Sequence, residues 1–123
     1  MPRTVLIVDD EPDALEMYKT ILTKEGFRAL TAGSGQECLR VLEKEKVDLV
    51  LLDVFMPKMS GRQVAEEIRK NPKLKDVNVA FLTIAEFSKT GKELIKEYSP
   101  IDYIQKPVGL SDFVNKVKAI LRA

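Results

Sequence analysis

Residues 5–12, Val-Leu-Ile-Val-Asp-Asp-Glu-Pro, are the most informative stretch of the sequence, because a continuous apolar run is followed directly by three acidic residues and a proline. An uninterrupted run rich in β-branched residues is typical of a strand buried on both faces of a parallel sheet. Pro12 suits the first turn of a helix, where the missing N–H has no intrahelical partner. Leu15, Tyr18 and Leu22 then recur at helical spacing, and Gly26 indicates the end of that helix. The stretch therefore predicts a buried strand followed by an amphipathic helix.

The same alternation of apolar runs and amphipathic stretches continues to the end of the chain. Ser34 with Glu37, and Ser60 with Gln63, have the spacing of capping boxes and predict the starts of two helices. The sequence predicts four further strands and two further helices. The strands are expected at Phe27–Ala32, Leu49–Leu52, Val79–Ile84 and Ile101–Gln105. A weaker helix is expected around Leu94, Ile95 and Tyr98, and a helix with a clear apolar stripe from Leu110 to Leu121.

Strict strand–helix alternation predicts a parallel sheet with helices on both faces. The first, third and fourth runs are almost wholly apolar, which suits central strands, whereas the second and fifth contain polar residues, which suits edges. We therefore expect one α/β domain over residues 1–123, a doubly wound five-stranded sheet of order 2-1-3-4-5 as in flavodoxin-like folds. Its ligand site is expected at the carboxyl ends of the first and third strands, where the winding reverses.

The composition excludes several classes of function. The chain has 123 residues, 20 Lys+Arg and 19 Asp+Glu, so its formal charge of +1 argues against direct binding of nucleic acid by bulk electrostatics. No apolar run is long enough to span a membrane and no secretion-signal pattern is present, so we expect a cytoplasmic protein. The absence of histidine excludes Ser-His-Asp and Cys-His catalysis, and the single cysteine, Cys38, excludes an intrachain disulfide. Chemistry is left to carboxylates, hydroxyls, lysines or a bound hard metal.

Acidic residues stand at the predicted ligand site. Asp9 and Asp10 follow the first strand and Asp53 ends the third. At ~5 Å and an effective dielectric constant of ~20, each like-charge pair costs roughly 3 kcal/mol. A hard divalent cation such as Mg²⁺ would offset that cost. The alternative is that Asp9, Asp10 and Glu11 only cap the first helix, but this alternative does not account for Asp53.

Two more polar residues are expected at the same edge of the sheet. Thr83 ends the fourth strand, and Lys106 follows the fifth strand directly before Pro107. Taken singly, the threonine is more typical of a structural hydroxyl and the lysine of a solvated charge. Together with a carboxylate nucleophile and a metal, they are the groups needed to receive and stabilise a phosphoryl group.

At this point the chain resembles, over essentially its full length, the receiver domain of two-component response regulators, including the chemotaxis-regulator type. Four motifs carry the resemblance, each at its proper strand end. They are Val8-Asp9-Asp10-Glu11-Pro12, the run from Asp53-Val54-Phe55-Met56-Pro57-Lys58 to Gly61, Leu82-Thr83, and Asp102-Tyr103-Ile104-Gln105-Lys106-Pro107.

The resemblance implies a role for each matching residue. Asp53 would be the phosphoacceptor, receiving its phosphoryl group from a histidine kinase or phosphotransfer protein. Asp10, Asp53 and the backbone carbonyl of Phe55 would bind Mg²⁺, with Asp9 acting through water. Thr83 and Lys106 would hold phosphoryl oxygens. Tyr103, together with Thr83, would be the switch.

The resemblance also implies how such a protein works with others. It would be a signalling domain rather than a metabolic enzyme, although it would promote its own phosphotransfer and slow dephosphorylation. Its output would pass to a downstream protein or to a fused output domain. It would be a monomer, or a weak dimer through the face formed by strand five and its flanking helices.

Three alternatives can be weighed against this hypothesis, and residues of the sequence argue against each; for the first of them, these are the intact Asp9, Asp10, Asp53, Thr83 and Lys106. Ile84 stands where the family has a small residue, so a pseudo-receiver, which binds protein without phosphorylation, is the main alternative. An aspartate-nucleophile phosphohydrolase of the haloacid dehalogenase type would want a carboxylate at Phe55. A flavin carrier would want a Ser/Thr/Gly-rich loop in place of the acidic one after the first strand.

Overall fold

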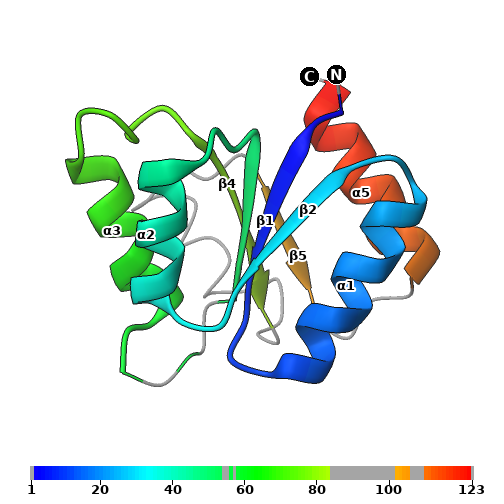
Figure 1. Cartoon of the computed structure of the whole chain (residues 1–123), viewed down its shortest axis with the longest axis horizontal. Helices are drawn as coiled ribbons and strands as arrows, with labels where there is room; N and C mark the ends of the chain where they lie inside the picture. The colour runs from blue at the N-terminus through cyan, green and yellow to red at the C-terminus, as the bar shows by residue number, and fades with distance from the viewer. Residues whose placement is uncertain (1, 54–55, 57, 84–101, 106–109, 123) are drawn as a thin grey trace.

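The computed structural model describes residues 2–53, 56, 58–83, 102–105 and 110–122. Strands and helices alternate along most of this part of the chain (Figure 1). The elements are β1 (Thr4–Val8), α1 (Pro12–Lys24), β2 (Arg28–Ala32), α2 (Gly35–Lys44), β3 (Leu49–Asp53), α3 (Gly61–Lys70), β4 (Asn78–Thr83), β5 (Asp102–Gln105) and α5 (Leu110–Arg122). The helix expected around Leu94, Ile95 and Tyr98 lies outside the described residues.

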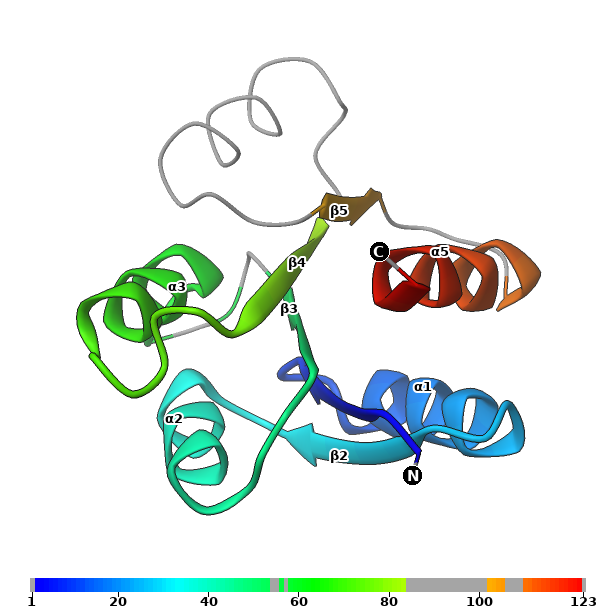
Figure 2. The same ribbon diagram turned by 90° about the horizontal axis from the view of Figure 1, so that it is seen from above.

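The strands form one sheet in the order β2-β1-β3-β4-β5, and every neighbouring pair is parallel. The predicted fold class and strand order are confirmed. Helices α1 and α5 cover one face of the sheet, and α2 and α3 cover the other (Figure 2). In the part of the chain that the structure describes, no helix has the length and apolar character needed to cross a membrane.

The central strands are buried because both of their faces carry apolar side chains. Every residue of β1 and β3 is buried. Alternate residues point to opposite faces, so Leu6 and Val50 belong to the cluster under α2 and α3, whereas Val5 and Leu49 belong to the cluster under α1 and α5. Cys38 lies in the first cluster, where burial raises the pKa of its thiol to about 12, as expected for an unreactive core residue.

Helix ends follow the sequence signals in detail. Gly26 has a φ of +92° after α1, and its N–H donates to the carbonyl oxygen of Thr23 at 3.1 Å. The N–H of Phe27 donates to the carbonyl oxygen of Leu22 at 3.0 Å, which completes a Schellman motif. Because Phe27 is used in this cap, β2 begins at Arg28, one residue later than the sequence predicts.

The two predicted capping boxes differ. Ser60 makes the complete box: its hydroxyl accepts from the N–H of Gln63 at 3.3 Å, and the Gln63 side chain accepts from the N–H of Ser60 at 2.9 Å. Ser34 accepts from the N–H of Glu37 at 3.2 Å, but the Glu37 carboxylate accepts from the N–H of Gly33 instead. The prediction of a full capping box at Ser34 is therefore wrong in one respect: the Glu37 side chain accepts its hydrogen bond from Gly33 and not from Ser34. Ser34 is fully extended (φ −157°) whereas Ser60 is not (φ −70°), so their own N–H groups point differently.

Candidate functional site

The register of the sheet brings the acidic residues together. Val8 of β1 is aligned with Leu52 of β3, so the residues that follow both strands emerge at the same edge. One carboxylate oxygen from each of Asp9, Asp10 and Asp53 lies within 4.8 Å of the other two. These three residues are called the acidic cluster below. The convergence that the sequence predicts is thus present at the switch point between β1 and β3.

Burial makes this cluster unusual for a group of aspartates. The exposed fractions of Asp9 and Asp53 are only 1% and 7%, whereas Asp10 is exposed. The backbone fixes Asp9, because its N–H donates to the carbonyl oxygen of Ala32 at 3.2 Å. One of its carboxylate oxygens accepts from the N–H of Glu11 at 3.0 Å. The cluster therefore combines two buried carboxylates with one that faces solvent.

Helix capping does not account for the cluster. The N-cap residue of α1 is Glu11, which has an extended backbone and no side-chain capping hydrogen bond. The N-terminal end of α1 still lies beside the cluster, and its partial positive charge favours carboxylates there. Such a dipole is worth about 0.3–1 kcal/mol, less than the roughly 3 kcal/mol of each like-charge contact. A bound cation would offset the repulsion that the helix dipole leaves.

The donor set of the acidic cluster fits a hard divalent cation. Carboxylate oxygens are the protein ligands that Mg²⁺ prefers, and these carboxylates offer one oxygen each within 4.8 Å. The exposed carboxylate of Asp10 leaves a side of the cluster accessible to solvent. Asp9, Asp10 and Asp53 are the described residues that would hold such an ion.

For two of the other predicted site residues the structure gives the backbone position only, and the rest lie outside the described residues. Asp53 pairs with Leu82 of β4, so Thr83 follows at the same sheet edge, and Thr83 in turn pairs with Gln105 of β5. Tyr103 lies on β5 beside Phe81. The side chains of Thr83 and Tyr103 are not described. Phe55, Ile84, Lys106 and Pro107 lie outside the described residues.

The structure has a cavity beside the acidic cluster that the sequence did not predict. Its volume is about 310 Å³, and it lies between the turn before α2 and the segment before α3. Asp10 contributes to its lining, together with Gly33, Ser34, Gln36, Met56, Lys58 and Met59. Met56 is buried and Lys58 has a φ of +67°. These methionines are packing residues as well, because both contribute to the core cluster under α2 and α3.

Gly35 allows this close packing. An ideal Cβ at Gly35 would lie 2.5 Å from Cγ2 of Val64 and 2.8 Å from Sδ of Met59. The first turn of α2 can therefore approach α3 only without a side chain at this position. The one available sequence signal was a glycine directly after the N-cap Ser34.

Comparison with known proteins identifies the family to which this chain belongs. The sequence pattern of the response regulator receiver domain matches residues 5–118. The alkaline phosphatase synthesis transcriptional regulatory protein PhoP of Bacillus subtilis is 34% identical over 122 residues, which is 99% of this chain and 50% of PhoP. The chain therefore belongs to the response regulator receiver domain family of two-component systems.

Solved structures give the same result. The chemotaxis protein CheY4 of Vibrio cholerae superimposes with a TM-score of 0.91 at 26% identity, covering 98% of this chain and 100% of that one. The response regulator TrrA of Thermotoga maritima, solved in complex with Mg²⁺ and BeF, has a TM-score of 0.82 at 35% identity, covering 97% and 99%. This chain spans half or less of the curated relatives that it matches, 50% of PhoP and 26% of another. The phosphohydrolase and flavin-carrier alternatives are wrong, since the chain belongs to another family.

Proposed function

We propose that Asp53 accepts a phosphoryl group from a histidine kinase or phosphotransfer protein in a Mg²⁺-dependent reaction. Phosphorylation then changes a surface that binds a downstream partner. The observation that carries this proposal is the acidic cluster, in which the Asp53 carboxylate is almost buried yet lies within 4.8 Å of a solvent-exposed carboxylate. That environment supplies a positioned nucleophile and the ligands for a charge-neutralising cation.

The chemistry assigns one task to each residue. A carboxylate oxygen of Asp53 forms a bond to the phosphorus of a phosphohistidine, the phosphorus–nitrogen bond breaks, and its electron pair returns to the imidazole. By family resemblance, Asp10, Asp53 and the backbone carbonyl of Phe55 would hold Mg²⁺, with Asp9 acting through water. When bound, Mg²⁺ supplies positive charge to the phosphoryl oxygens.

Family resemblance assigns the remaining tasks. The hydroxyl of Thr83 and the ammonium of Lys106 bind the phosphoryl oxygens. Because Thr83 and Tyr103 lie on adjacent strands, movement at Thr83 can reach Tyr103 on β5. The switched surface is the face formed by β5 and its flanking helices, through which a monomer can also form a weak dimer.

Two relatives support this assignment. TrrA was solved with Mg²⁺ and BeF, and PhoP is named as a transcriptional regulatory protein. In this proposal residues 1–123 act as one cytoplasmic receiver domain. It signals to a downstream protein or to a fused output domain, and does not itself contact nucleic acid.

Phosphorylation of the purified protein by phosphoramidate tests the proposal, with intact-protein mass spectrometry as the readout. Wild type should gain one phosphoryl group only when Mg²⁺ is present, and Asp53→Asn should gain none. Asp76→Asn is the matched control, because it removes an exposed carboxylate from the turn after α3 and should leave uptake unchanged. Uptake by Asp53→Asn, or uptake by wild type in the presence of a chelator, would contradict the assignment.

The same samples distinguish a switching receiver from a pseudo-receiver. Addition of Mg²⁺ and beryllofluoride should shift the amide resonances of the acidic cluster and of residues 102–105. Shifts confined to the acidic cluster would show that a ligand binds without switching, as expected if Ile84 blocks the movement of Thr83.

A further inference from the structure

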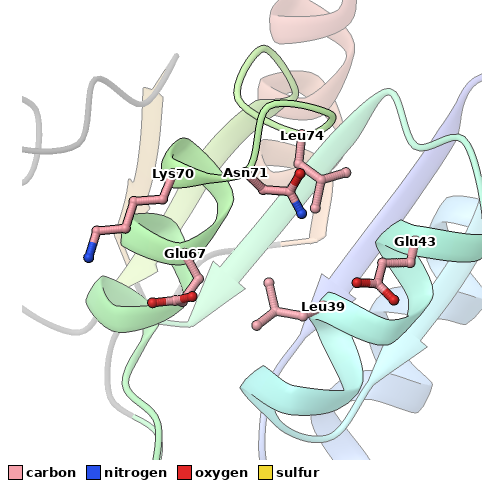
Figure 3. A pocket seen from close by; sticks show the side chains of 6 residues that line it. All are labelled: Leu39, Glu43, Glu67, Lys70, Asn71 and Leu74. Atoms are coloured by element: carbon pink, nitrogen blue, oxygen red, sulfur yellow. The ribbon is translucent and has the colours of Figure 1, made fainter.

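A second concave site lies between α2 and α3, away from the acidic cluster (Figure 3). Its volume is about 280 Å³. Both helices begin at the carboxyl edge of the sheet, where the acidic cluster lies, and the site runs along their later turns. We call it the α2–α3 groove; it is lined by Leu39, Glu43, Glu67, Lys70, Asn71 and Leu74.

The groove has an apolar floor that the core holds in place. Leu39 and Leu74 are partly buried and pack against the core cluster under α2 and α3. Figure 3 shows both leucine side chains facing the space between the two helices, with the Asn71 amide beside Leu74. An apolar side chain placed on this floor would gain roughly 25 cal/mol for each square ångström removed from water.

Hydrogen bonds fix the wall that α3 contributes. The N–H of Asn71 donates to the carbonyl oxygens of Glu67 and Ile68, and its side-chain oxygen accepts from the N–H of Lys73 at 2.9 Å. The guanidinium of Arg69 donates to the carbonyl oxygens of Lys75 and Val77 at 2.8 and 2.9 Å. The groove is therefore formed before anything binds, which lowers the entropy cost of docking.

The charges around the floor are predominantly negative. Glu43 and Glu67 flank it from opposite helices. Among the described residues neither has a carboxylate oxygen within 4.0 Å of a cationic nitrogen, and the charge of Glu67 contributes to the raised pKa of Lys70. Lys70 is the one cation of the lining, and Figure 3 shows its ammonium extending away from the leucines. The ammonium pairs with Glu66 at 2.9 Å. A partner that brings cations next to an apolar group would thus meet complementary charge on both sides.

We propose that the α2–α3 groove docks a short segment of a partner protein in which one apolar side chain stands between lysines or arginines. The apolar side chain would occupy the space between Leu39 and Leu74, and the cations would approach Glu43 and Glu67. A cavity of about 280 Å³ lies just below the roughly 300–1,000 Å³ typical of small-molecule pockets, so a single inserted side chain is the better fit.

This docking site goes beyond the proposed phosphoryl transfer. The groove contains no residue of the acidic cluster and none of β5, so it stays available whether or not Asp53 is phosphorylated. Binding there would hold the protein near a partner while the other end of the molecule switches. Its test needs no phosphoryl donor, and its failure would leave the proposed function of Asp53 untouched.

The test is a titration of the isotope-labelled protein with synthetic pentapeptides, followed by amide chemical shifts. Each peptide has the form Lys-Arg-X-Arg-Lys with blocked ends, where X is Leu, Ile, Met or Phe, and a control carries Ser at X. At least one apolar peptide should bind saturably with a Kd at or below about 1 mM, with shifts centred on Leu39, Asn71 and Leu74. The Ser peptide should bind about tenfold more weakly, a difference of about 1.4 kcal/mol.

Two matched double variants separate docking from general charge attraction. Glu43→Gln with Glu67→Gln should weaken binding about tenfold. Glu16→Gln with Asp112→Asn removes the same charge from exposed positions on α1 and α5 and should leave the Kd within about twofold. The proposal is overturned if no peptide binds at about 1 mM, if both double variants weaken binding equally, or if the shifts gather at the acidic cluster.

Discussion

The function proposed for Asp53 opposes the stability of the folded protein. Its carboxylate is 7% exposed and lies beside two others, so the folded state carries repulsion that the unfolded chain relieves by separating them. Because the proposed phosphoryl transfer needs the ionised carboxylate, this cost cannot be removed without losing the proposed nucleophile. Such a conflict is common at functional sites, where local stability gives way to chemistry.

The Asp53→Asn variant should therefore be more stable than wild type in metal-free buffer. Removing one of the crowded charges is expected to raise the free energy of unfolding by on the order of 1 kcal/mol, since Asp10 is solvent-screened. Mg²⁺ should raise the melting temperature of wild type by mass action and that of the variant much less. Thermal unfolding with and without Mg²⁺ measures both effects. Identical melting of the two proteins under both conditions would show that the carboxylates do not repel one another.

Among the helices and strands, the contact between α2 and α3 depends on a glycine, which has no side chain to keep them apart. Gly35 lies under Val64 and Met59, and both α2 and α3 pack against the same side of the sheet. The path of the segment before α3, which carries Met59 and one side of the cavity near Asp10, thus depends on how closely the two helices approach. Helix packing and the shape of the site are linked through this one position.

Gly35→Ala should be destabilising by about 1–3 kcal/mol, because the new Cβ would overlap the stiff, buried side chain of Val64. Gly33→Ala is the control: the nearest atom to its Cβ is 3.8 Å away, so its free energy of unfolding should change by less than about 0.5 kcal/mol. Urea unfolding of the two variants measures the difference. Equal midpoints would mean that α2 and α3 separate without cost.

Local sequence signals predicted most of these elements, and non-local contacts explain what they missed. The buried run at Val5–Val8, the Schellman end at Gly26 and the box at Ser60 each depend on neighbouring residues, so the pattern alone was sufficient. The convergence of the acidic cluster followed from strand order. The packing of Gly35 against Val64 joins residues far apart in the chain, and no local pattern encodes such a contact.

The α2–α3 groove was missed for the same reason. Glu43 and Glu67 look like ordinary charges on solvated helix faces, and only the arrangement of the two helices places them across one floor. The roles of Thr83, Tyr103, Phe55 and Lys106 came from family resemblance and stay predictions.

At the scale of the whole molecule, α1 and α5 are joined by two contacts of different kinds. The rings of Tyr18 and Phe113 lie with centroids 4.6 Å apart inside the core. Outside, the ammonium of Lys118 pairs with the carboxylate of Glu25 at 2.6 Å, across 93 residues of sequence. The side chains of this ion pair are 38% and 34% exposed, so water screens their attraction.

The buried contact should therefore dominate the stability of the α1–α5 layer. Phe113→Ala is expected to lower the free energy of unfolding by about 3–5 kcal/mol, a large part of the roughly 5–15 kcal/mol of a typical domain. Lys118→Met, which keeps most of the alkyl chain, should lower it by no more than about 1 kcal/mol. Chemical denaturation of both variants, repeated at high salt, provides the comparison. A loss of similar size for Lys118→Met would show that the ion pair, rather than the rings, joins the two helices.

The position of β1 between β2 and β3 has a consequence for how the chain is made. During synthesis Thr4–Val8 emerges before Leu49–Asp53, so its second edge is covered only after the later strand has been added. Until then an uncharged, β-branched segment presents unpaired backbone groups, the type of segment that joins other nascent chains into aggregates. Asp9, Asp10 and Glu11 follow it immediately, and clustered negative charge at the end of such a segment opposes its stacking on identical copies. We therefore expect the carboxylates that crowd the finished protein to oppose aggregation of the unfinished chain.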